Sequence, residues 1–263
     1  MRRIAIRRNG PKRAAGFSLG QRFSASAIRR TTSLSERISL SKLKGPDFLD
    51  TSTTARLLRF DSLLAAKSTG RFAGVDEAGR GPLAGPVVAA AVIFIRTNSL
   101  LGALQGLNDS KQLPARRREI LFQAILKIAL IGVGVVDEEQ IDRLNIFQAS
   151  RLAMKRAVLS LSRTPDVLLI DGNARIDLPL TQQTLVGGDG KSAVIAAASV
   201  VAKVYRDAWM RHLDELYPAY DFKNHKGYPT PRHLRMIQKI GPSPVHRKSF
   251  SPVRSFFVEK ESR

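Results

Sequence analysis

The stretch GVDEAGRGPLAGPVVAAAV, residues 74–92, decides the fold of this chain. Its first residues complete an apolar run from Phe72 to Glu77 that predicts a strand, and its last residues open a second run, Val87 to Ile95, that predicts a buried strand. The residues between the two runs are rich in glycine and proline, which is typical of a turn. A short turn lets the strands pair directly, so the stretch predicts the first two strands of a sheet.

The chain after residue 95 alternates between helix and strand patterns. Apolar residues recur with helical spacing from Pro114 to Ala129, and the proline stands near the expected helix start. The other expected helices cover residues 145–161 and 192–216, and the other expected strands cover residues 131–136, 167–170 and 183–186. This order predicts an α/β fold with a central mixed sheet of five strands flanked by helices, plus a C-terminal helical segment.

The composition is that of a basic protein without cysteine. The 263 residues include 43 Lys or Arg and 22 Asp or Glu, and the net charge of +21 favours a polyanionic partner such as nucleic acid or an anionic membrane surface. The absence of cysteine excludes disulfides, thiolate metal sites and cysteine nucleophiles. No run reaches the roughly 18 apolar residues that a membrane span needs, so we expect a soluble protein.

The positive charge is concentrated at the N-terminus. Residues 1–45 hold twelve Lys or Arg and one acid, Glu36, among many small polar residues. We expect a basic, disordered leader over residues 1–65 and a folded domain over residues 66–263. The leader is open to three interpretations: an arm that binds nucleic acid, an organellar transit peptide, or an extension without function.

Acidic residues follow the apolar strands and are the best candidates for chemistry. Asp76 and Glu77 end the first predicted strand, and Asp171 ends the strand at residues 167–170. Asp189 lies in a glycine-rich loop just before the helix expected at residues 192–216. Sites form at strand ends in open α/β sheets, and oxygen ligands favour Mg²⁺ or Mn²⁺. A pair of such ions suits phosphodiester hydrolysis.

Strand geometry raises an objection to one shared site. Neighbouring strand residues point to opposite faces, so Asp76 and Glu77 would need a twist or bulge at the strand end to act together. Each acid taken alone is also explained as a cap, a turn residue or an ion-pair partner. Spacing by itself therefore leaves the site open.

Seven stretches of the sequence together resemble bacterial ribonuclease HII. Besides residues 74–92, they are NDSK at 108–111, IDGN at 170–173, GDGKS at 188–192, AASVVAKVYRD at 197–207, HKGY at 225–228 and GPSPVHRKSF at 241–250. They occur in the order of that family and cover about residues 72–254. One departure is the glycine pair at 187–188, where the family pattern suggests a lysine and a small residue.

The resemblance implies an RNase H-like fold in which residues 66–263 form the catalytic domain. It implies that Asp76, Glu77, Asp171 and Asp189 bind divalent metal, Mg²⁺ or Mn²⁺, for catalysis. The expected activity is hydrolysis of the RNA strand of RNA–DNA hybrids, and incision 5′ to ribonucleotides embedded in duplex DNA, with water as nucleophile. The expected products carry 3′-hydroxyl and 5′-phosphate ends, as suits a role in DNA replication and repair.

The resemblance also implies contacts with the substrate. It assigns Gly79, Arg80 and Gly81 to the ribonucleotide and its phosphate, and Tyr228 to the neighbouring deoxyribose and to sensing of the 2′-hydroxyl. Other residue types that suit phosphate binding, or else simply solvated loops, are Asp109, Ser110, Lys111, Lys191 and Ser192.

Two functional classes compete: a nuclease and a non-catalytic nucleic-acid binder. The acids favour the nuclease, because carboxylates beside phosphate would repel the ligand unless cations neutralised them. We expect a cytoplasmic monomer, or an organellar protein if residues 1–45 are a transit peptide; nothing in the sequence supports a sliding-clamp partner. Asp207 is expected to pair with Lys203 or Arg211, and the four histidines show no metal-binding pair.

Overall fold

The computed structural model describes residues 51–66, 70–95 and 100–258. Its centre is one sheet of five strands in the order β3-β2-β1-β4-β5. The strands are β1 Phe72–Ala78, β2 Val87–Phe94, β3 Ala129–Val136, β4 Val167–Asp171 and β5 Thr181–Leu185. β1 pairs antiparallel with β2 and parallel with β4, so the sheet is mixed, as the sequence predicts.

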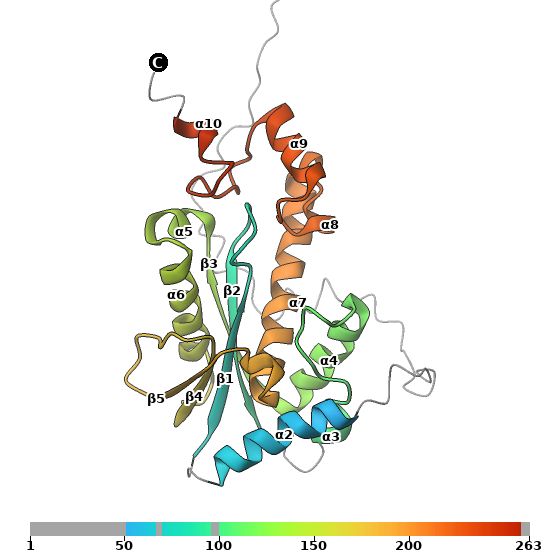
Figure 1. Cartoon of the computed structure of the whole chain (residues 1–263), viewed down its shortest axis with the longest axis vertical. Coiled ribbons are helices and arrows are strands. Elements are labelled where there is room, and N and C mark those ends of the chain that lie inside the picture. The colour runs from blue at the N-terminus through green and yellow to red at the C-terminus, as the bar shows by residue number, and fades with distance from the viewer. Residues whose placement is uncertain (1–50, 67–69, 96–99, 259–263) are drawn as a thin grey trace, which may run out of the picture.

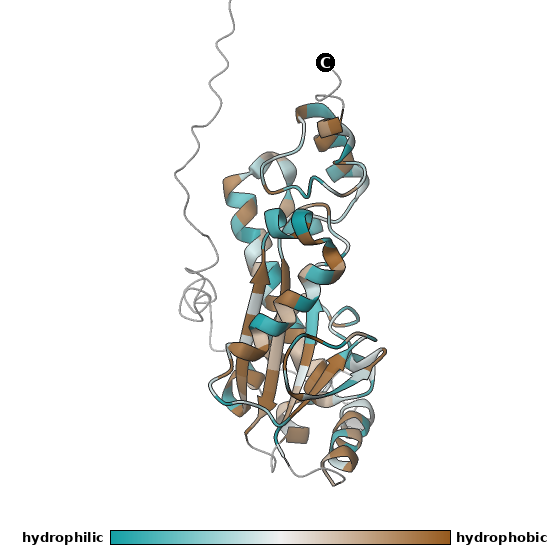
Figure 2. Ribbon diagram, turned by 90° about the vertical axis from the view of Figure 1, so that its left-hand side faces the viewer, coloured by the Kyte–Doolittle hydropathy of each residue, from teal (hydrophilic) through white to brown (hydrophobic). Residues whose placement is uncertain are grey.

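Helices cover both faces of this sheet (Figure 1). The helices are α2 Thr51–Ala65, α3 Leu100–Ala103, α4 Ala115–Ile128, α5 Glu138–Leu144, α6 Ile146–Leu159, α7 Ala193–Leu216, α8 Phe222–His225, α9 Pro231–Ile240 and α10 Ser255–Val258, with 3-10 turns at Gly188–Gly190 and Pro218–Tyr220. One apolar core lies between the sheet and α7, with α4 and α2 at its margin. A second lies between the sheet and α6. Figure 2 shows the apolar strands at the centre of the molecule.

Most predicted elements are confirmed within a few residues. The fifth strand, expected at residues 183–186, occupies Thr181–Leu185. The expected helical C-terminal segment is present as α8, α9 and α10, which join the end of α7 around a third apolar cluster that includes Trp209, Tyr220 and Phe222. No helix in the described part of the chain is long and apolar enough to cross a membrane.

The expected domain boundary at residues 65 and 66 is wrong in one respect. Residues 51–65 are not part of an irregular leader but form the helix α2, whose Leu57 is fully buried in the core beside α7. The ordered domain therefore begins by Thr51. The disorder expected for residues 1–50 lies outside the described residues.

Two glycines let β3 approach α6 closely. A Cβ atom added to Gly134 would lie 2.0 Å from the carbonyl oxygen of Ala153, and one added to Gly132 would lie 2.1 Å from that of Ala157. Both neighbours are helix backbone, which cannot move without displacing α6. Helix α6 can therefore pack closely against β3 because Gly132 and Gly134 carry no side chains.

Gly134→Ala should accordingly destabilise the protein. We expect a loss of about 1–3 kcal/mol, because the added methyl group overpacks the contact with α6, and a fall in melting temperature of about 5 °C. Gly102→Ala in α3 is the matched control, since a Cβ there meets nothing within 4 Å. Thermal unfolding followed by circular dichroism measures both variants, and equal melting temperatures would contradict the close-packing account.

Candidate active site

Two acids meet where the parallel strands β1 and β4 end. The register pairs Val75 with Ile170, so Asp76 and Asp171 come next along adjacent strands. Asp76 is almost fully buried, and its Oδ1 accepts a hydrogen bond of 2.7 Å from the Glu77 amide. The sequence prediction that these acids stand at neighbouring strand ends is therefore consistent with the fold.

Glu77 reaches the same acids without the bulge that strand geometry suggested. The pairing of β1 with β2 is unbroken through Asp76, Glu77 and Ala78, which rules out a bulge there. Asp76 interacts with Ser199 of α7 on one side of the sheet, whereas Glu77 lines a small pocket with Phe147 and Ser150 of α6 on the other. Asp171 interacts electrostatically with both, so it links acids that point to opposite faces.

Asp189 is carried by the 3-10 turn Gly188–Gly190 that precedes α7. The turn is fastened to β4, because the Gly188 amide donates a hydrogen bond of 2.6 Å to Oδ1 of Asp171. Asp189 is mostly buried, at 8% exposure. The loop therefore brings the fourth predicted acid beside the third.

The mutual repulsion of these acids is visible in their pKa values. Burial raises the pKa of Asp76 well above its usual value, and the charges of Glu77 and Asp171 raise it further. Burial also raises the pKa of Glu77, although Arg80, whose Nη1 lies 3.3 Å from Glu77 Oε1, opposes this shift. The pKa of Asp189 is raised by burial and by the neighbouring acids. Positive charge close to these acids would therefore stabilise their ionised forms.

Lys111 supplies part of that charge. Burial lowers the pKa of its ammonium group, but four carboxylates outweigh burial and raise the pKa above its usual value: Asp76, Asp109, Asp189 and Asp171. The sequence pointed to Lys111 only as a phosphate contact. The structure places it within electrostatic reach of three of the four predicted metal ligands.

The donor set of the cluster suits a hard divalent cation. All four side chains offer carboxylate oxygens, and burial together with neighbouring negative charge raises the pKa values of Asp76, Glu77 and Asp189. Among the described residues, no group of three or more His, Asp or Glu side chains is placed so that it could hold a metal ion as the side chains stand. The acids therefore fit a metal by the chemistry of their oxygen ligands.

The glycine loop after β1 lies against Tyr228. A Cβ atom added to Gly81 would stand 3.7 Å from Cε1 of the Tyr228 ring, and that ring is 43% exposed. The Leu83 amide also donates to the carbonyl of Gly227, with an N···O distance of 2.8 Å. The structure therefore brings together the two segments predicted to contact the ribonucleotide, and the ring faces solvent beside them.

Two buried arginines, which the sequence did not single out, hold these segments in place. Arg247 donates to the carbonyl oxygens of Gly79 at 2.6 Å, Arg80 at 2.9 Å and Gly85 at 2.8 and 2.9 Å. Arg206 of α7 donates to the carbonyl oxygens of Ala84, Pro86 and Lys226. Arg206 thereby joins the glycine loop to the segment of Tyr228. Arginine is seldom fully buried in proteins, so the residue type alone predicts a surface position and not this structural role.

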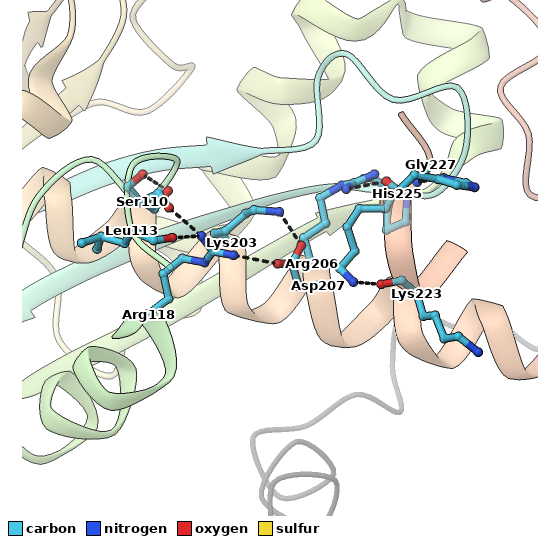
Figure 3. Close-up of polar contacts among 12 residues, drawn as sticks. Ser110, Leu113, Arg118, Lys203, Arg206, Asp207, Lys223, His225 and Gly227 are labelled. Carbon is cyan, nitrogen blue, oxygen red and sulfur yellow. Dashed lines mark hydrogen bonds and ion pairs between the residues drawn. The ribbon is translucent and has the colours of Figure 1, made fainter. Parts of the chain in front are cut away.

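The loop at residues 108–113 is fastened to α4 and α7 (Figure 3). Arg118 donates to the carbonyl oxygens of Ser110 and Leu113 and lies 3.5 Å from Asp207. The expected pairing of Asp207 with Lys203 is confirmed, with Nζ 2.5 Å from Oδ1. Asp207 is therefore structural, as predicted, and it helps to position the loop that carries Lys111.

The structure corrects the expected role of two serine hydroxyls. Ser110 is 3% exposed, and its Oγ lies 2.8 Å from the Oγ of Ser199, so it faces α7. Ser192 is fully buried and caps α7 by accepting from the Ile195 amide. Burial and existing hydrogen bonds prevent both hydroxyls from reaching a phosphate. Lys191 is exposed, with its Nζ bonded to the carbonyl of Val186.

Three of the histidines cluster behind Tyr228, although they are far apart in sequence. The Nε2 atoms of His233 and His246 lie 3.0 Å apart, and the rings of His225 and His233 stack at 4.3 Å. Burial lowers the pKa of His233 to about 4 and that of His246 to about 3, so both are neutral at physiological pH. His233 Nδ1 lies 2.9 Å from the Tyr228 carbonyl oxygen, and the cluster supports that segment.

Comparison with known proteins gives a consistent result along the domain. The family model described as Ribonuclease HII matches residues 73–253. The ribonuclease HII of Geobacillus kaustophilus is 50% identical over 206 residues, which cover 78% of this chain and 77% of the relative. The ribonuclease HII of Bacillus pumilus is 52% identical over 200 residues, which cover 76% and 77%.

Solved structures agree with these relatives. Ribonuclease H2 from Pyrococcus horikoshii aligns with a TM-score of 0.61 and 26% identity, over 73% of this chain and all of that one. The ribonuclease HII in a complex with PCNA from Archaeoglobus fulgidus aligns with a TM-score of 0.59 and 27% identity, over 69% and 95%. The expected RNase H-like fold is thereby confirmed.

Removing the Arg247 side chain should loosen the glycine loop and destabilise the protein. Arg247→Ala leaves the carbonyl groups of Gly79, Arg80 and Gly85 without this donor, two of them buried, and we expect it to cost about 3–5 kcal/mol of unfolding free energy. Arg247→Lys should recover only part of this loss, because a single ammonium cannot replace the planar fork. Chemical denaturation measures the change against Arg163→Ala, an exposed arginine. Equal stability of the Arg247 and Arg163 variants would refute the role assigned to Arg247.

Proposed function

Because this chain belongs to the ribonuclease HII family, we propose that it incises duplex DNA on the 5′ side of embedded ribonucleotides as well as cleaving longer RNA tracts. As a ribonuclease of type HII, it is a metal-dependent phosphodiester hydrolase that acts on the RNA strand of RNA–DNA hybrids. The observation that carries the finer proposal is the electrostatically coupled cluster of four acids beside the exposed Tyr228 and the glycine loop.

Asp76, Glu77, Asp171 and Asp189 are the residues that would hold two divalent cations, Mg²⁺ or Mn²⁺. The chemistry supplied there is activation of a water molecule and stabilisation of the leaving oxygen. The chain itself contributes the fixed positions of the acids: Asp76 by its bond to the Glu77 amide, Asp171 by its bond to Gly188, and Asp189 through the turn that follows. These bonds hold the acids close together against their repulsion.

The reaction is a hydrolysis that conserves all atoms of water. The water oxygen bonds to the phosphorus on the 5′ side of the ribonucleotide, and the bond from phosphorus to the 3′-oxygen of the preceding nucleotide breaks. That oxygen takes a proton and leaves as a 3′-hydroxyl, while the ribonucleotide keeps a 5′-phosphate. Such ends can serve as a primer terminus, which suits a role in DNA replication and repair.

Recognition of the ribonucleotide is assigned to the glycine loop and Tyr228. A 2′-hydroxyl can come close to the main chain at Gly81, where a Cβ atom would meet only Tyr228, at 3.7 Å. Gly79 and Arg80 contribute through the position of the loop, since a Cβ atom at Gly79 would collide with Arg206 and both carbonyl groups accept from Arg247. The exposed Tyr228 ring beside Gly81 offers a surface for the neighbouring deoxyribose. Arg206 and Arg247 act as positioning residues for both segments.

Phosphate contacts and cellular setting complete the proposal. Lys111 supplies positive charge near the acids, and Asp109 orders its loop because Oδ1 of Asp109 accepts from the Lys111 amide at 2.8 Å. Lys191 is exposed beside Asp189 in the sequence and is assigned to a phosphate of the substrate. We place the enzyme in the bacterial cytoplasm as a monomer. By analogy with the Archaeoglobus complex of ribonuclease HII with PCNA, a sliding clamp is the kind of protein partner to test.

A DNA duplex with one internal ribonucleotide tests the activity directly. With Mg²⁺ or Mn²⁺ we expect one cut on the 5′ side of the ribonucleotide, and with EDTA no cut. Asp76→Asn removes a ligand charge and should lower the rate by more than the roughly 10- to 100-fold that outer-shell substitutions cost. Denaturing gel analysis locates the cut. Failure of folded wild-type protein to cut this duplex or a longer hybrid with either metal would leave a nucleic-acid binder as the better account.

Substitutions of Tyr228 test recognition of the ribonucleotide separately from hydrolysis of the phosphodiester. Loss of a stacking ring costs about 1–3 kcal/mol, so Tyr228→Ala should lower kcat/KM on the single-ribonucleotide duplex by about 10- to 100-fold. Tyr228→Phe keeps the ring and isolates the contribution of the hydroxyl. Steady-state kinetics on single-ribonucleotide and all-RNA substrates give the comparison, and a Tyr228→Ala enzyme with wild-type kcat/KM on both would remove Tyr228 from the site.

A further inference from the structure

Helix α2 lies outside the segment that the ribonuclease HII family model matches, yet it contacts the loop that carries Asp189. The matched segment begins at residue 73, and α2 ends at Ala65. In Figure 1 the helix lies beside the end of α7 that follows this loop. A helix that contacts the Asp189 loop from outside the matched segment has a role that the match to the family model does not describe.

The packing of α2 is that of a permanent part of the domain. Leu57 is fully buried in the core that includes the first turns of α7, and Leu58 and Leu64 pack at its edge. Thr54 is fully buried as well, and its Oγ1 donates 3.2 Å to the carbonyl of Leu104 after α3. Thr54, Leu57 and Asp61 share one helix face at spacings of three and four residues. The helix is thus anchored along its length.

Asp61 binds the N-terminus of α7 directly. Its Oδ2 accepts a hydrogen bond of 2.9 Å from the Val194 amide, one of the amides that a helix leaves without a partner in its first turn. Ser192 Oγ takes the next such amide, that of Ile195. Burial raises the pKa of Asp61 to about 6, while bonds to Ser192 and the first amides of α7 lower it, so the carboxylate is charged at neutral pH. A negative charge at this position also interacts favourably with the positive end of the α7 helix dipole.

A second contact reaches the loop on the other side of Ser192. Arg56 Nη2 donates 3.3 Å to the carbonyl oxygen of Gly190, the residue next to Asp189. The loop's own backbone bonds run from Gly190, Lys191 and Ser192 back to Gly187 and Gly188. The two contacts from α2 therefore lie on either side of Ser192, at the end of a short turn that Asp171 also holds through the Gly188 amide.

We infer that α2 is a clamp that positions the Asp189 loop for cation binding, with Asp61 as its positioning residue. The inference rests on the proposed function, because it takes Asp189 as a metal ligand. Asp61 touches neither substrate nor cation. It fixes the start of α7, and with it the point where the loop ends.

The test compares full-length Asp61→Ala and Asp61→Asn with wild type in three measurements. Amide hydrogen exchange of residues 188–195 should become about fivefold faster in Asp61→Ala, the effect of losing one helix cap. The Mn²⁺ concentration for half-saturation, measured by calorimetry without substrate, should rise by a similar factor. Asp61→Asn keeps an acceptor for the Val194 amide and should show about a twofold change in each.

Two controls separate the clamp from a general loss of stability. Arg59→Ala removes an exposed side chain from the same helix and should change none of the measurements. Ile141→Ala destabilises the distant helix α5 and should lower the melting temperature without altering exchange at residues 188–195 or the Mn²⁺ midpoint.

The outcomes distinguish this inference from the proposed function. Unchanged exchange and an unchanged Mn²⁺ midpoint in Asp61→Ala would overturn the clamp, whatever happens to the melting temperature. If wild type cuts no ribonucleotide substrate, the proposed function fails, and the exchange measurement still decides whether α2 holds the loop.

Discussion

The parallel pairing of β1 with β4 is the constraint on which the rest of this structure depends. It places the buried carboxylate of Asp76 beside the partly buried carboxylate of Asp171, where like charges repel. Two hydrogen bonds hold that arrangement, because the Glu77 amide donates to Asp76 and the Gly188 amide donates to Asp171. The cationic side chains of Arg80 and Lys111 lie nearby and reduce the repulsion. The folded protein thus keeps these acidic side chains close together, whereas in the unfolded chain their repulsion would separate them.

The sequence predicted what depends on local pattern. The strand β1, the strand β2 and the helix α7 each have long apolar periodicity, and the acids at their ends stood out for that reason. Prediction from the sequence failed where an element is stabilised by contacts with residues far away along the chain. α2 is stabilised by bonds such as that from Val194 to Asp61, across 133 positions, and its short amphipathic pattern beside a basic leader resembled an irregular segment.

Buried polar side chains were the other class that local pattern could not reveal. Arg206 and Arg247 carry pKa values of about 10 and 9 because burial lowers them, yet both remain charged and satisfied by backbone carbonyl groups. The sequence predicts Ser110 and Ser192 as phosphate contacts or residues of solvated loops, yet both are buried. The spacing of His225, His233 and His246 does not predict that their rings pack together. Only tertiary packing defines these environments, so single-residue tendencies were uninformative.

The bond from Arg247 to Gly79 spans 168 positions, and this has a consequence for the synthesis of the protein. Translation proceeds from the N-terminus, and domains fold as their parts emerge. The nascent chain can pair β1 with β2 early, but the carbonyl groups of Gly79, Arg80 and Gly85 in the loop between them lack their arginine donor until Arg247 has been made. All four acidic residues of the cluster precede Arg247 in the sequence, so they are synthesised before the contact that fastens this loop can form.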